Sequence, residues 1–168
     1  PTHDGMKGNI DGMTPYRKYS QFDSTKNMDY VRYSIDAVNA ACRRAKNYGM
    51  KMYQWHHELD LPTGFKEAYP EIVNRFGDVE VTHPQVKDFL ENKIRDFFCT
   101  YPDMDGIILT LHETKIPLLK LKDQKLGKVE RVKYVTKILF DTCEALGKEL
   151  IVRPFASIEE DYVMMTKA

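Results

Sequence analysis

The chain has 168 residues, of which 42% are hydrophobic and 30% charged, and its 25 basic residues balance its 25 acidic residues. This composition predicts a folded globular domain and excludes a disordered chain. Because the formal net charge is zero, a general phosphate-backbone partner is not expected, and we predict no nucleic-acid partner. No apolar run approaches the ~20 residues that a spanning helix needs, so we predict no membrane partner either.

The three cysteines, Cys42, Cys99 and Cys143, are odd in number and lack the spacing of metal ligands. Each lies beside apolar residues in a helical pattern, so we expect all three to be small core residues. They say little about the compartment, and a secreted or periplasmic location stays open. The chain begins at Pro1, without an initiator Met or the apolar core of a signal peptide. We therefore expect either that a signal peptide has been removed or that the sequence starts inside a longer protein.

In the first half of the chain, one helix and one strand are predicted between two irregular segments. Residues 1–28 have little apolar periodicity and indicate a long loop or irregular arm. Apolar residues then recur at helical spacing over 29–47, and a strand follows over 50–55. The connection 56–81 is too long for ordinary scaffolding, so we predict a ligand-facing loop with local turns.

In the second half, helices and strands alternate. Helix 84–99 begins at Pro84, the apolar run 106–111 is a buried strand, and helix 129–146 and strand 149–153 follow. A capping box formed by Ser157 and Glu160 predicts a fourth helix.

This alternation predicts an α/β fold with a parallel sheet built of β/α repeats. No glycine-rich phosphate fingerprint follows any strand, which disfavours a dinucleotide-binding fold and favours a TIM-type (β/α)8 barrel. Since only three strands are predicted, we expect residues 1–168 to be a single domain or, more specifically, part of an incomplete barrel. A compact α/β domain of three or four strands is the alternative.

Ionisable residues follow all three strands, at the ends where parallel α/β enzymes gather their catalytic groups. These residues are His56, His57, Glu58 and Asp60 after the first strand, His112, Glu113 and Thr114 after the second, and Arg153 after the third.

Glu113 is the main catalytic candidate. It follows a buried strand, and a partly desolvated carboxyl group suits a general acid, which glycoside cleavage requires together with a second carboxylate. The structural alternative is an ion pair with Arg153 that only ties the rim of the sheet together. His112 is the second catalytic candidate, since it could orient the acid or a substrate hydroxyl.

The other candidates are substrate-binding residues. His56 and His57 look like a metal pair, but adjacent strand residues point to opposite faces, and the zinc pattern H-E-x-x-H is not completed. We therefore expect no metal and no cofactor, and assign His56, His57 and Glu58 to substrate contacts. Trp55 could stack on a sugar ring, and Arg153 could clamp a substrate carboxylate.

The segments YGMKMYQWHHELDLPTGF, HPQVKDFLENKIRDFF and DGIILTLHET resemble (β/α)8 glycoside hydrolases, in particular α-glucuronidase-like enzymes and related bacterial families. The resemblance implies that Glu113 is the acid and that the second carboxylate comes from a later strand. His112 stands where the large clan of retaining barrel glycosidases commonly carries Asn.

The predicted function is therefore a glycoside hydrolase with a carbohydrate substrate and, for a fragment, the remainder of the barrel as partner. One alternative is a metal-dependent sugar isomerase-like barrel with His56 or His57, Glu58, His112 and Glu113 as ligands. Another is a non-catalytic carbohydrate-binding domain.

Overall fold

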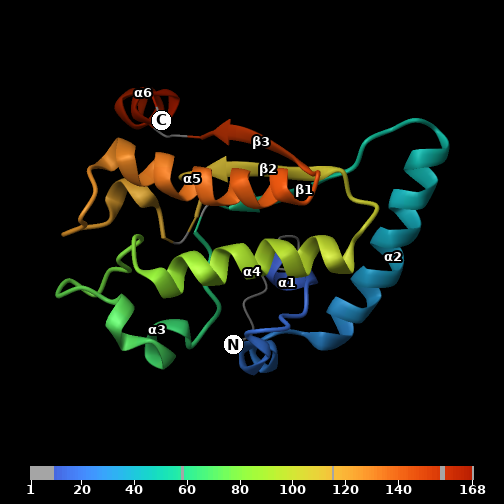
Figure 1. Ribbon diagram of the computed structural model, residues 1–168, viewed down its shortest axis with the longest axis horizontal. Helices are drawn as coiled ribbons and strands as arrows, with labels where there is room; N and C mark the ends of the chain where they lie inside the picture. The colour runs from blue at the N-terminus through green and yellow to red at the C-terminus, as the bar shows by residue number, and fades with distance from the viewer. Residues whose placement is uncertain (1–9, 58, 115, 156–157, 168) are drawn as a thin grey trace.

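A computed structural model of the protein describes residues 10–57, 59–114, 116–155 and 158–167 (Figure 1). Over these residues three strands alternate with long helices. The elements in chain order are α1 (Ile10–Met13), the 3-10 helix η2 (Ser20–Thr25), α2 (Met28–Asn47), β1 (Tyr53–His57), α3 (Phe65–Ala68), η3 (Pro70–Ile72), α4 (Pro84–Thr100), β2 (Gly106–Leu111), η4 (Leu118–Lys120), α5 (Lys128–Ala145), β3 (Glu149–Pro154) and α6 (Glu159–Thr166).

The three strands form one parallel sheet in the order β1-β2-β3. Tyr53 of β1 aligns with Gly106 of β2, which aligns in turn with Glu149 of β3. The predicted parallel α/β sheet is therefore confirmed. A closed barrel is not seen, because the described residues supply three strands.

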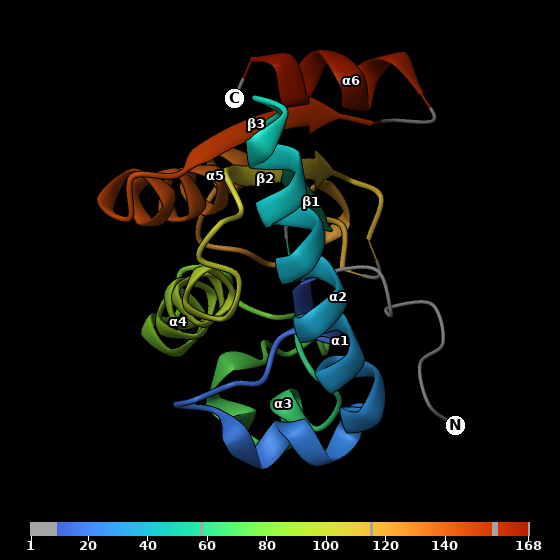
Figure 2. The same cartoon turned by 90° about the vertical axis from the view of Figure 1, so that its right-hand side faces the viewer.

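Helices α4 and α5 pack against each other and lie on the same side of the sheet (Figure 2). Pro84 begins α4, and the Nδ1 atom of the preceding His83 accepts a hydrogen bond from the Gln85 amide, which caps the first turn. The strand residues Ile107, Leu109 and Leu111 are buried on this side. Alternate residues of β2 thus build a core with the two helices, as their apolar periodicity predicts.

The long helix α2 lies at the other end of the sheet, beside the starts of the strands (Figure 1). Asn39 donates to the carbonyl oxygen of Thr100 at 3.0 Å, and Lys46 pairs with Asp103 at 2.7 Å. Helix α2 thus contacts the end of α4 and the turn that follows it, rather than the side of the sheet that α4 and α5 cover.

Two segments that were predicted as loops contribute many side chains to the hydrophobic core. Within residues 10–28, α1 and η2 are short and irregularly connected, as expected, but Ile10, Tyr19 and Phe22 are buried. In the connection 56–81, Phe65 and Ile72 are fully buried, so the prediction of a ligand-facing loop is wrong for these residues. The apolar side chains explain the error, because they cover the start of α4 rather than facing solvent.

The structure tests the prediction that the three cysteines are core residues. Cys42 and Cys143 are buried as predicted, whereas Cys99 is exposed because it lies on the outer side of α4.

No helix in the described part of the chain is long and apolar enough to cross a membrane. Ser157 of the predicted capping box lies outside the described residues, although α6 does follow it.

Candidate active site at the carboxyl edge of the sheet

The face of the sheet opposite α4 and α5 carries most of the predicted site. The register aligns Trp55, Ile108 and Ile151 in one row across the three strands. His57, Thr110 and Arg153 form the next row toward the carboxyl edge, on the same face because strand residues alternate. Trp55 is 39% exposed and Ile151 is 43% exposed, so this face is open to solvent. We call these two rows the open face.

Trp55, His57 and Thr110 are held together on the open face. The indole Nε1 of Trp55 donates to the Thr110 hydroxyl of the neighbouring strand. The rings of Trp55 and His57 lie 4.6 Å apart between centroids. Since the indole is fixed and yet partly exposed, it offers an apolar plane on which a sugar ring could stack.

Glu113 and Arg153 meet at the edge of the open face. Their side chains form an ion pair of 3.5 Å, and the same guanidinium nitrogen lies 3.5 Å from the Thr110 hydroxyl. The guanidinium carbon of Arg153 is also 5.2 Å from the ring centroid of Phe155. The structure thus contains the rim contact that the sequence offered as the alternative to catalysis. Both side chains remain partly exposed, at 39% and 48%, which leaves them accessible to a ligand.

His112 lies beside Glu113 in the chain but contacts another element. Its backbone adopts the left-handed conformation, with φ at 70°. Its Nε2 atom lies 3.3 Å from the Asp161 carboxylate of α6, and both side chains are largely buried. A non-glycine residue in this conformation needs support from its surroundings, and the contact with α6 supplies it.

The structure separates the two adjacent histidines. His57 belongs to the open face, whereas His56 points toward the helices and is completely buried. The two rings therefore lie on opposite faces of the sheet, as expected for adjacent strand residues. His56 does not belong to the open face, which carries Trp55 and Arg153. Glu58, the third predicted substrate contact after β1, lies outside the described residues.

A second group of polar residues surrounds His56 in the interior. Single ligand atoms of Asp11, His56 and Asp60 all lie within 4.8 Å of one another. The Lys93 ammonium of α4 is 3.4 Å from the Asp11 carboxylate and donates to the Asp60 carbonyl oxygen at 2.9 Å. We refer to Asp11, His56, Asp60 and Lys93 as the buried cluster. All four side chains are buried.

Burial shifts the protonation equilibria within this cluster. It lowers the pKa of His56 well below its ordinary value, and the nearby Lys93 charge acts in the same direction. Burial, together with the negative charge of Asp11, raises the pKa of Asp60. His56 is therefore held neutral, the form in which an imidazole accepts a hydrogen bond or binds a metal.

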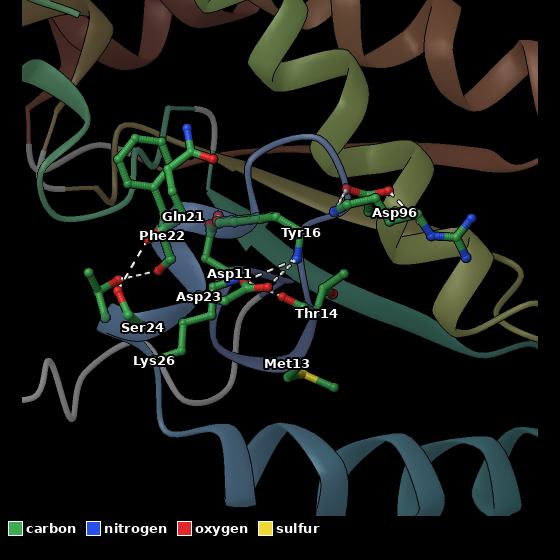
Figure 3. Close-up of polar contacts among 12 residues, drawn as sticks. Asp11, Met13, Thr14, Tyr16, Gln21, Phe22, Asp23, Ser24, Lys26 and Asp96 are labelled. Carbon is green, nitrogen blue, oxygen red and sulfur yellow. Dashed lines mark hydrogen bonds and ion pairs between the residues drawn. The ribbon is translucent and has the colours of Figure 1, made fainter. Parts of the chain in front are cut away.

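A second layer of polar contacts fixes Asp11 from the outside (Figure 3). The Tyr16 hydroxyl donates to Asp11, and burial followed by the Asp11 charge raises the pKa of this phenol. Asp23 accepts from the Tyr16 amide at 3.1 Å and pairs with Lys26 at 2.9 Å. The Lys26 ammonium lies 3.1 Å from the centroid of the Tyr16 ring.

Sequence reasoning missed Asp11 and Lys93, which come from distant segments. One signal was available for Lys93, because it occupies the apolar face of its helix between Phe89 and Phe97. A charged residue at such a position needs a buried partner. No comparable signal marked Asp11, since its segment shows no periodicity.

A surface pocket of about 350 Å³ lies at the opposite edge of the sheet. Its lining includes Pro102 and Lys148, which precede β2 and β3. None of the predicted site residues lines it.

Comparison with known proteins gives no relative from which a function could be transferred. No protein-family model, no curated protein and no solved structure matches the chain. The site must therefore be interpreted from its own geometry.

Proposed function

We propose that the chain is part of a (β/α)8-type glycoside hydrolase whose substrate binds at the carboxyl edge of the open face. The observation that carries this proposal is the convergence of Trp55 on β1, Arg153 on β3 and Glu113 just after the end of β2. An aromatic plane, a carboxyl group and a guanidinium are the groups that carbohydrate sites use to bind and cleave sugars.

The strand order supports a barrel rather than a doubly wound fold. Consecutive strands are neighbours, and both crossover helices, α4 and α5, lie on the same face. A doubly wound sheet places its helices on both faces, whereas a barrel keeps them all outside. In this proposal the open face is the barrel interior, and Trp55, Ile108 and Ile151 would be covered by further β/α units.

In the proposed reaction Glu113 protonates the leaving glycosidic oxygen. Its ion pair with Arg153 must then loosen when substrate binds, because an acid has to hold its proton until transfer. A sugar that carries a carboxylate would cause this change directly, since it would replace Glu113 as the partner of Arg153. The second carboxylate that the reaction requires would come from another strand of the barrel.

The test is Glu113→Gln in the full-length enzyme. Turnover of a glycoside with a poor leaving group should fall by ~10²–10⁴-fold, because Gln keeps the shape of Glu but cannot donate the proton. The loss should be smaller for an activated aryl glycoside, whose departure needs less protonation. Glu149→Gln is the matched control, since Glu149 lies on the same sheet face at the opposite edge and pairs with Lys51.

Other results would favour other functions. Near-normal hydrolysis of the poor substrate by Glu113→Gln would show that Glu113 only pairs with Arg153 at the rim. Sugar binding without turnover by the unmodified enzyme would indicate a carbohydrate-binding domain. Activity that is lost on chelation and restored by a metal would favour the isomerase-like alternative.

A further inference from the structure

The His56 side chain is fully buried, and neither ring nitrogen has a hydrogen-bond partner among the described residues. Leaving a buried polar group without a partner is destabilising, because the group loses its hydrogen bonds to water and gains none in return. Imidazole is uncommon as filling for an apolar core, and β1 could have placed an aliphatic residue here, opposite Leu109 of β2. The residue therefore indicates that something else satisfies its ring.

Two buried carboxyl groups lie beside this ring, each from a separate segment. Asp11 belongs to α1, and Asp60 belongs to the turn after β1. Since the three ligand atoms lie within 4.8 Å of one another, a single ion could contact all of them. We propose that Asp11, His56 and Asp60 bind a divalent transition-metal ion of the Zn²⁺ class.

The donor set selects the class of ion. Zn²⁺ binds imidazole nitrogen and carboxylate oxygen at about 2.0–2.2 Å and prefers four ligands in a tetrahedron. At those bond lengths the ligand atoms of a tetrahedron lie about 3.4 Å apart, so ligand atoms now as far apart as 4.8 Å would move closer by up to about 1.4 Å when the ion binds. Mg²⁺ and Ca²⁺ prefer all-oxygen sites and are disfavoured by His56.

The charges in the buried cluster fit a cation. Asp11 and Asp60 can carry two negative charges, and the buried Lys93 ammonium balances one of them. Like charges buried together repel one another strongly, and a dication bound between the two carboxylates would offset that repulsion. Lys93 then lies near the ion and weakens its binding, which means that removing the Lys93 charge should tighten it.

The site has a structural role. It connects α1 to β1 on the helix side of the sheet, whereas Trp55, His57 and Arg153 lie on the open face. Its ligands are also buried, which leaves no open approach for a substrate. The proposal therefore stands independently of the glycoside hydrolase assignment.

The experiment measures metal binding by the purified chain. After dialysis against Zn²⁺, the unmodified protein should hold one equivalent, and Co²⁺ in its place should give the absorption bands of a tetrahedral ion. His56→Gln and Asp11→Asn should each weaken Zn²⁺ binding by about 10–100-fold or more, the range found when metal sites lose even an outer contact. His57→Gln is the matched control and should leave the affinity unchanged.

Lys93→Met tests independently whether the Lys93 charge weakens Zn²⁺ binding. It should raise the Zn²⁺ affinity several-fold, whereas a site filled by a bridging water predicts only lower stability and no stoichiometric zinc. The proposal is overturned if the unmodified chain holds no stoichiometric Zn²⁺, or if His56→Gln and His57→Gln bind it equally. Should His56→Gln fail to fold by circular dichroism, Asp60→Asn and the Co²⁺ spectrum of the unmodified protein decide between the outcomes.

Discussion

Burial of individual side chains determines the reactivity of the three cysteines. Burial raises the pKa of Cys143 to about 12 and also raises that of Cys42, while Cys99 is exposed. At pH 8 the buried thiols therefore remain protonated, and the thiolate is the reactive form. We expect iodoacetamide to modify Cys99 first, measured by mass spectrometry of the digested protein. In denaturant all three should react, and equal rates in the native protein would contradict the assignment.

Phe65 tests the corrected role of the long connection after β1. Its ring is fully buried and contacts the rings of Tyr19, Phe22 and Phe89. Phe65→Ala should lower the free energy of unfolding by about 3–5 kcal/mol, as measured by urea denaturation. A ligand-facing Phe65 would instead leave stability unchanged and weaken sugar binding. Exposed Phe76, from the same connection, is the matched control, and Phe76→Ala should change stability little.

Only those residues of the candidate site that directly follow a strand could be predicted from the sequence. Glu113 and Arg153 could be placed together because each follows an apolar run, and parallel strands align their carboxyl ends. Asp11 and Lys93 could not be joined to His56, because no local pattern indicates which distant segment packs over a strand. Their contact is a property of tertiary structure alone.

At the scale of elements, Gly106 controls how closely β2 approaches β3. A Cβ atom at this position would collide with the backbone carbonyl of Glu149 and lie 3.0 Å from the Tyr53 ring. Gly106→Ala should therefore destabilise the protein by about 1–3 kcal/mol or more, because the colliding atom is backbone and cannot turn away.

Gly127→Ala provides the control for this substitution. Gly127 precedes α5, and a Cβ there would meet only the flexible Glu130 side chain. We expect its effect on unfolding, measured by the same denaturant titration, to be well below that of Gly106→Ala. Equal losses in the two variants would mean that the close approach of β2 and β3 is not the reason for glycine.

The element boundaries show where local pattern succeeds and where it fails. The predicted helix from residue 84 and strand 106–111 match α4 and β2 closely, because proline and an apolar run mark them. The first strand was predicted over 50–55, whereas β1 extends from Tyr53 to His57. The Met50 amide is used to close α2 through the Ala45 carbonyl, and His57 pairs with Thr110. The strand therefore begins and ends later than predicted, because hydrogen bonds to other elements set its bounds and the hydropathy pattern contains no information about those bonds.

Across the whole molecule, the two sides of the sheet differ in character. Helices α4 and α5 bury one side of β1 and β2, where His56 and Leu109 are fully buried, while the open face and α6 expose large apolar side chains. The edge strand β3 is exposed on both sides, since Val152 and Ile151 are 42% and 43% exposed. Exposed apolar residues here include Trp55, Ile151, Phe155, Tyr162 and Val163. Large exposed apolar side chains that form a contiguous patch mark an interaction site on a folded protein. In the barrel proposal it is the surface that further β/α units cover.

The last prediction follows from this open face. The 168-residue chain by itself should self-associate as its concentration rises, because apolar faces of edge strands pair with one another. Ile151→Lys, in the centre of β3, should shift the chain toward monomer in sedimentation velocity and reduce the binding of an apolar dye. Tyr33→Lys is the matched control, since Tyr33 is 70% exposed on α2 and receives the same charge. A chain that stays monomeric at every concentration, or that responds equally to both substitutions, would show that the open face needs no covering partner.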